Sequence, residues 1–126
     1  MSTWPCPLSS IAVAVAQFDR RSRPAISGRR LHLDKVAETA EEFTDLLAER
    51  ATALGGTPEG RVHAIAESSS LPRYPSQIVS EREHVDALST ALATFGKAAR
   101  EAIDEAERLG DANTADVFTE ISRETD

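Results

Sequence analysis

Two long stretches of the chain repeat apolar residues at alternating intervals of three and four, the spacing of one face of an α-helix. The longer repeat follows Ser80 and Glu83, which have the spacing of an N-terminal capping box, and it stops at Gly110. The sequence therefore predicts a long amphipathic helix here. Its apolar positions are Val85, Leu88, Leu92, Phe95, Ala99, Ala102, Ala106 and Leu109.

The earlier repeat starts at Leu31 and stops at the pair Gly55-Gly56, which predicts a helix of about six turns. A third, shorter helix is predicted to begin with Asn113 or Thr114 as its N-cap. The apolar positions of these two helices are Leu33, Val36, Ala40, Phe43, Leu47, Ala51 and Leu54 in the first, and Ala115, Phe118 and Ile121 in the second.

Residues 55–79 form a long connection between the two long helices. This segment contains three glycines, three prolines and three consecutive serines, with one short helical turn predicted near residues 62–67. Because an extended chain rises about 3.3 Å per residue and a helix only about 1.5 Å, the connection is long enough to return along the first helix. The next long helix therefore need not be antiparallel to it.

Composition agrees with an all-α fold. Aromatic residues make up only 5% of the chain, and helix-forming residues dominate after residue 30. A chain of 126 residues has the size of one domain. We expect an atypical basic arm at residues 1–30 and a helical domain at residues 31–126.

Charge and cysteine content indicate the compartment and exclude several classes of partner. The net charge is −7, although residues 1–30 carry five arginines and one aspartate. An acidic body repels nucleic acid, so only this arm is suited to DNA. The single cysteine, Cys6, excludes an intrachain disulfide, and the apolar run at 11–18 is too short to cross a bilayer. We expect a cytoplasmic protein without membrane contact.

Three acidic residues of the first helix share one face. At about 100° per residue, Asp34, Asp45 and Glu49 lie within about 60° of one another and opposite the apolar positions. One interpretation is a solvated acidic face. The other is a site for a hard cation, because carboxylates four residues apart on a helix can bind one metal ion. A site on the face opposite the core would need a second chain to complete it.

Several motifs in residues 31–126 resemble the Dps family of mini-ferritins (DNA-protection-during-starvation proteins, ferritin-like superfamily). The most specific is the run AERATALGGTP at residues 48–58. The others are Leu31-His32-Leu33-Asp34, Asp45-x-x-x-Glu49-Arg50-Ala51, Tyr74-Pro75, Asp111-x-x-Thr114-Ala115-Asp116 and Ile121-Ser122-Arg123.

The resemblance implies a ferritin-like four-helix bundle with a long crossover between the second and third helices. The three predicted helices are similar to the family's second, third and fourth, so the first helix is expected to be missing or replaced, and the chain to be incomplete at both ends. Family members form hollow dodecamers that oxidise Fe(II) with hydrogen peroxide, store ferric iron, and in some cases coat DNA during stress.

By the same resemblance, Asp34, Asp45 and Glu49 correspond to the family's ferroxidase carboxylates, and His32 is the nearest candidate for its imidazole ligand. Iron (Fe²⁺/Fe³⁺) is the implied cofactor, a homo-oligomer the implied assembly, and ferroxidase the implied activity. However, only Leu33 separates His32 from Asp34, whereas the family has three intervening residues. The alternative is therefore a noncatalytic helical remnant that oxidises no iron.

The two remaining histidines and the arginine-rich arm are weaker candidates for a functional role. His63 and His84 lack partners at metal-ligand spacing and are expected to be surface or cap-region histidines. The arginines at residues 20–30 are suited to weak, salt-sensitive binding of DNA phosphates. The alternative for this arm is an unstructured segment without a partner.

Overall fold

The computed structural model describes residues 30–125, and the side chains of residues 35–125. This part of the chain contains four α-helices and no strand: α2 (Arg30–Ala53), α3 (Val62–Ser68), α4 (Glu81–Arg108) and α5 (Ala112–Thr125). The all-α prediction is confirmed, and the predicted helical turn in the connection is the two-turn helix α3. The predicted basic arm and the expected loss of the first helix concern residues that lie outside the described part, apart from Arg30.

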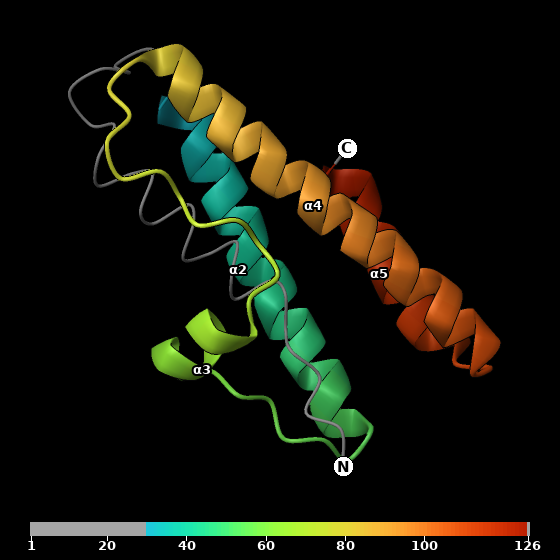
Figure 1. The fold of residues 1–126 in the computed structure, drawn as a ribbon. Helices are drawn as coiled ribbons and strands as arrows, with labels where there is room; N and C mark the ends of the chain where they lie inside the picture. Colours follow the sequence, from blue (N-terminus) through green and yellow to red (C-terminus); the bar gives the residue numbers. More distant parts are fainter. Residues whose placement is uncertain (1–29, 126) are drawn as a thin grey trace.

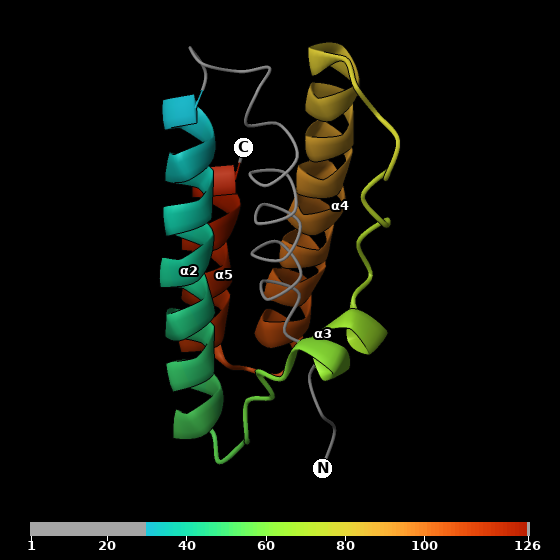
Figure 2. The same ribbon diagram turned by 90° about the vertical axis from the view of Figure 1, so that its left-hand side faces the viewer.

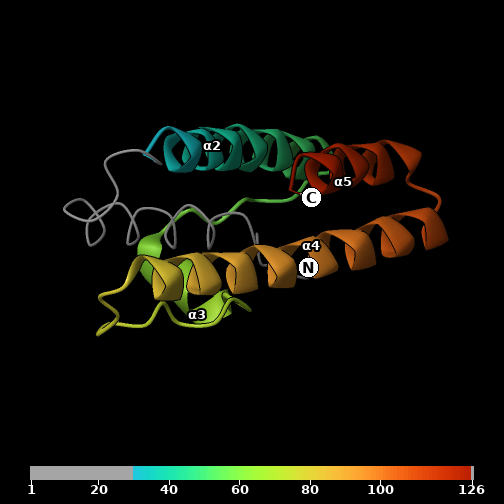
Figure 3. The same ribbon diagram turned by 90° about the horizontal axis from the view of Figure 1, so that it is seen from above.

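The three long helices lie side by side, and the crossover returns the chain from one end of the bundle to the other (Figures 1 and 2). As a result α2 and α4 run in the same direction, while α5 runs back along α4. Viewed from above, α2 and α5 form one row and α4 lies opposite them (Figure 3). This arrangement agrees with a ferritin-like bundle.

One core joins the three long helices. It contains Ala40 and Phe43 from α2, Phe95 and Ala99 from α4, and Phe118 and Ile121 from α5. Phe95 and Ile121 are the largest side chains buried completely. No Cα atom of α2 lies within 8 Å of one of α4 in the described part of the chain, so the aromatic rings span the distance between these two helices.

The helix ends follow the predicted signals, with one correction. Ser80 and Glu83 form the predicted capping box, in which the Glu83 amide donates to Ser80 Oγ at 3.3 Å and the Ser80 amide donates to Glu83 Oε2 at 3.1 Å. Gly110 ends the α4 region with a φ of +75°, a conformation that favours glycine. The prediction of Asn113 or Thr114 as the N-cap of α5 is wrong, because Asp111 accepts a hydrogen bond from the Thr114 amide at 3.1 Å.

The apolar stripes of α2 and α4 are longer than the core, so some of their apolar residues are exposed. Leu54 and Leu109 are 59% and 64% exposed, and Val85 is 41% exposed. Each lies near an end of its helix, where no described element covers it. The helical period therefore predicts which face of a helix is apolar, but the length of the neighbouring helix decides how much of that face is buried.

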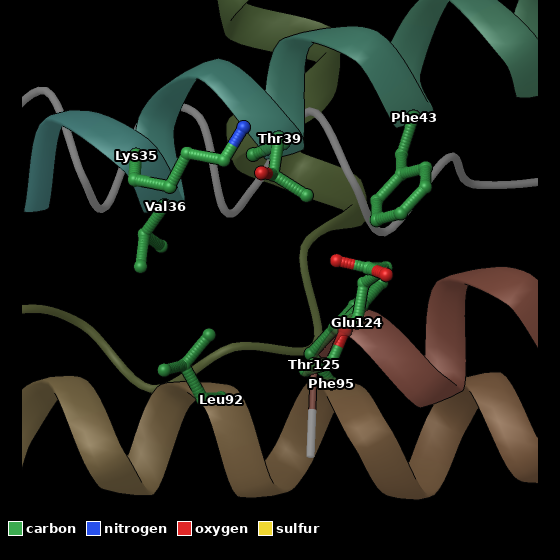
Figure 4. Close-up of a pocket in the computed structure, with 9 residues that line it drawn as sticks. Lys35, Val36, Thr39, Phe43, Leu92, Phe95, Glu124 and Thr125 are labelled. Carbon is green, nitrogen blue, oxygen red and sulfur yellow. The ribbon is translucent and has the colours of Figure 1, made fainter. Parts of the chain in front are cut away.

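A cavity of about 160 Å³ lies between the first half of α2, α4 and the end of α5. Figure 4 shows Val36 on α2 facing Leu92 on α4, and the ring of Phe43 pointing toward the Glu124 carboxylate, which lies between the two helices. At this cavity the side chains of α2 and α4 do not fill the space between the two helices.

Among the described helices, none is both long and apolar enough to cross a membrane.

Replacement of Phe95 by alanine should lower the free energy of unfolding by about 3 to 5 kcal/mol, because the ring is 2% exposed and links all three helices. Urea denaturation followed by circular dichroism measures this loss. The control Val62→Ala removes methyl groups from a side chain that is 72% exposed, and it should change the free energy by less than about 0.5 kcal/mol. Equal effects of the two substitutions would contradict the core described here.

Candidate metal centre

The described pair of predicted site residues, Asp45 and Glu49, lies on the outer side of α2. Both side chains are exposed, whereas Phe43 is buried and Leu46 and Leu47 pack against the core. Side chains four residues apart on a helix are neighbours on its surface, with Cβ atoms about 5–6 Å apart. The two carboxylates can therefore bind the same cation, and both are accessible from outside this chain.

The structure does not bring a third ligand to this pair. No group of three or more histidine, cysteine, aspartate or glutamate side chains with metal-binding geometry occurs among residues 35–125. The other two predicted ligands, His32 and Asp34, lie in the first turns of α2, where the backbone is helical but the side chains are outside the described part. Their roles stay predictions. Among the described residues, the candidate centre thus consists of two exposed carboxylates.

The side chain of Arg50, the residue that follows Glu49, contacts α5. Its Nε donates a hydrogen bond to Thr114 Oγ1 at 2.9 Å, and its Nη2 lies 2.7 Å from Asp111 Oδ1. Arg50 and Asp111 are both about one-quarter exposed, so this ion pair is partly shielded from water. Sequence reasoning identified these residues as motif positions but not as partners of one another.

Asp111 is the centre of a small polar network at the start of α5. Hydrogen bonds from the Thr114 hydroxyl at 2.5 Å and from the Thr114 amide are the largest causes that hold the pKa of the Asp111 carboxyl below its ordinary value, and the charge of Arg50 acts in the same direction. The carboxyl is therefore charged at neutral pH and serves both as a helix cap and as an ion-pair partner.

One histidine departs from its predicted environment. His63 is exposed, as expected, but His84 is 3% exposed. Its Nδ1 is hydrogen-bonded to the hydroxyl of Tyr74 at 2.5 Å, and the two rings are stacked. The expectation of a surface position is therefore wrong, while the cap-region position in the first turns of α4 is confirmed. The missed signal is that His84 lies four residues before Leu88, on the apolar stripe.

The buried ring of His84 fastens the crossover to α4. Tyr74 belongs to the connection between α3 and α4, so its contact fixes the returning chain against the helix that follows it. Because this histidine is buried and its Nδ1 already has a partner, it is a structural residue and is not available to the carboxylates of α2.

Acid should destabilise the fold partly through Asp111. Its pKa is lower in the folded protein than in the unfolded chain, where the ordinary value is 3.8, so the unfolded chain takes up a proton first and stability falls as the pH falls. Urea midpoints measured between about pH 6 and pH 2 should show a smaller acid-induced decrease for Asp111→Asn than for the wild type. Asparagine is an equally good N-cap, so the α5 start is retained. The exposed control Asp104→Asn should follow the wild-type curve, and identical curves for all three proteins would contradict this role.

Comparison with known proteins places these features in a family context. A family model for ferritin-like domains matches residues 22–126. The DNA protection during starvation protein of Agrobacterium fabrum is 36% identical over 94 residues, which are 75% of this chain and 58% of that protein. The protein of the same name from Halobacterium salinarum is 37% identical over 93 residues, which are 71% of this chain and 50% of that protein. The chain thus spans about half of the length of these relatives, and its resemblance to the Dps family is confirmed.

Proposed function

The chain belongs to the family of ferritin-like domains, and from this premise we propose that it is a Dps-type iron-binding protein that oxidises Fe(II) with hydrogen peroxide. The observation that carries the proposal is the exposed pair Asp45 and Glu49, one helical turn apart on the side of α2 opposite the core. The names of the two relatives support a role in protecting DNA during starvation.

In this proposal Fe(II) is the substrate, and the carboxylates of Asp45 and Glu49 bind it. Carboxylate oxygens suit hard cations, and their negative charge also stabilises the ferric product. Each hydrogen peroxide molecule takes one electron from each of two ferrous ions. Its O–O bond breaks, two protons are taken up, and two water molecules form. The ferric ions are then stored as mineral, away from the site.

A second copy of the chain completes the metal centre in this proposal. Asp34, with His32 as the nearest imidazole, is the contribution that we assign to the partner copy. This requirement implies a homo-oligomer, for which a dodecamer is the family precedent. The arginines of the N-terminal arm are proposed to give weak DNA binding through phosphate contacts, which salt would suppress.

A noncatalytic helical protein is the second candidate. It is favoured by the spacing of His32 and Asp34 in the sequence, which on a regular helix directs the two side chains about 200° apart. This candidate predicts a folded, helical protein whose presence adds nothing to the rate at which peroxide oxidises Fe(II). The measurement of iron oxidation therefore separates the two functions.

Removal of both carboxylates in Asp45→Ala/Glu49→Ala should lower the initial rate of peroxide-dependent Fe(II) oxidation by more than about tenfold, because these two are the described ligands to which the proposal assigns the ion. The rate is followed by ferric absorbance after anaerobic loading with Fe(II). The matched control Glu38→Ala/Glu42→Ala removes two exposed carboxylates with the same spacing from the same helix, and it should keep most of the activity. Equal loss in both variants would indicate a nonspecific effect of charge.

A further inference from the structure

Arg50 ties α2 to α5 through two donors of one rigid group. Nε and Nη2 of the guanidinium contact Thr114 Oγ1 and Asp111 Oδ1 at 2.9 Å and 2.7 Å. Because the guanidinium is planar, two such contacts define both the position and the orientation of the group. The acceptors are themselves fixed, since Thr114 is buried and Asp111 accepts hydrogen bonds from it.

The apolar contacts of α2 select the face that this helix buries, and the contacts of Arg50 add a directional constraint. Its core residues, Ala40 and Phe43, pack through apolar surfaces, which have no directional preference. Leu46 and Leu47 add apolar contacts of the same kind. The directional contact of Arg50 in the last two turns therefore narrows the rotation of α2 about its own axis further than burial of its apolar face does.

The rotation of α2 decides where its outer carboxylates lie. Glu49 is adjacent to Arg50, and Asp45 lies little more than one turn before it. The side chains of a helix extend to about 5–6 Å from the axis, so a rotation of about 20° moves a carboxylate by about 2 Å. A displacement of this size is enough to spoil the geometry of a bound ion.

We infer that Arg50 is a positioning residue for the iron-binding carboxylates, which acts by holding the last turns of α2 at one rotation against α5. The inference rests on the proposed function of Asp45 and Glu49. Arg50 itself does not contact the ion, because its guanidinium is engaged with Asp111 and Thr114.

The test is calorimetric titration of the full chain with Fe(II) alone, under anaerobic conditions. Arg50→Gln should bind Fe(II) about tenfold more weakly than the wild type, as is typical when a residue that orients metal ligands is lost. Asp111→Asn removes the charged partner from the other side while retaining the N-cap of α5, and it should weaken binding in the same way. Arg50→Lys should have an intermediate affinity for Fe(II), because lysine keeps the charge but cannot make two hydrogen bonds from one planar group.

Arg108→Gln is the matched control. Arg108 forms an ion pair with Glu105 on the same helix, α4, and does not tie α2 to another element. This variant should bind Fe(II) like the wild type. Circular dichroism and thermal unfolding of every variant establish that titrations are made below the unfolding transition, so that a change in affinity is not a loss of folded protein.

Combination with Asp45→Ala separates positioning from a general structural effect. If Arg50 acts through the carboxylates, Asp45→Ala/Arg50→Gln should bind no more weakly than Asp45→Ala alone. Wild-type affinity in Arg50→Gln and Asp111→Asn, together with a loss in Asp45→Ala, would overturn the inference and leave the proposed function intact. Equal affinity of the wild type and Asp45→Ala would overturn the proposed function, and this inference with it.

Discussion

The shared burial of aromatic rings from three helices is the interaction on which the rest of the structure depends. Phe43, Phe95 and Phe118 meet in one core although α2 and α4 are too far apart for their backbones to touch. Because these rings occupy the inner side of α2, its outer side is left to the carboxylates. The exposure of Asp45 and Glu49 is thus a consequence of how the core is packed.

Polar contacts add direction to this apolar framework. Arg50 joins the end of α2 to the start of α5, and the hydrogen bond of Tyr74 to the buried His84 holds the crossover against α4. Apolar packing selects the face that each helix buries, whereas charge-assisted hydrogen bonds also require particular positions of the two groups. The two kinds of contact together explain how a chain with few aromatic residues keeps a defined helix orientation.

Much of the fold is predictable because its determinants are local. The period of the apolar residues, the capping box at Ser80 and the stop at Gly110 identify α4 almost to the residue. The N-cap of α5 is less predictable, because Asn113 and Thr114 are also good capping residues and only the hydrogen bond to Asp111 decides among them. The apolar stripe indicates the burial of His84, but its hydrogen bond to Tyr74 is not predictable, because Tyr74 lies in an irregular segment whose path has no periodic signal.

The candidate site is less predictable than the fold, because in the proposed function its remaining ligands come from a second copy of the chain. The spacing of Asp45 and Glu49 predicts the outward-facing pair, but no local sequence signal identifies the ligands that would complete the site.

Anomalous diffraction at the iron edge, from crystals of the full chain loaded with Fe(II), tests most directly whether Asp45 and Glu49 bind iron. We expect an iron peak within coordination distance of the Asp45 and Glu49 carboxylates, with Asp34 of a second copy on its other side. Iron peaks elsewhere, with none at this pair, would contradict it.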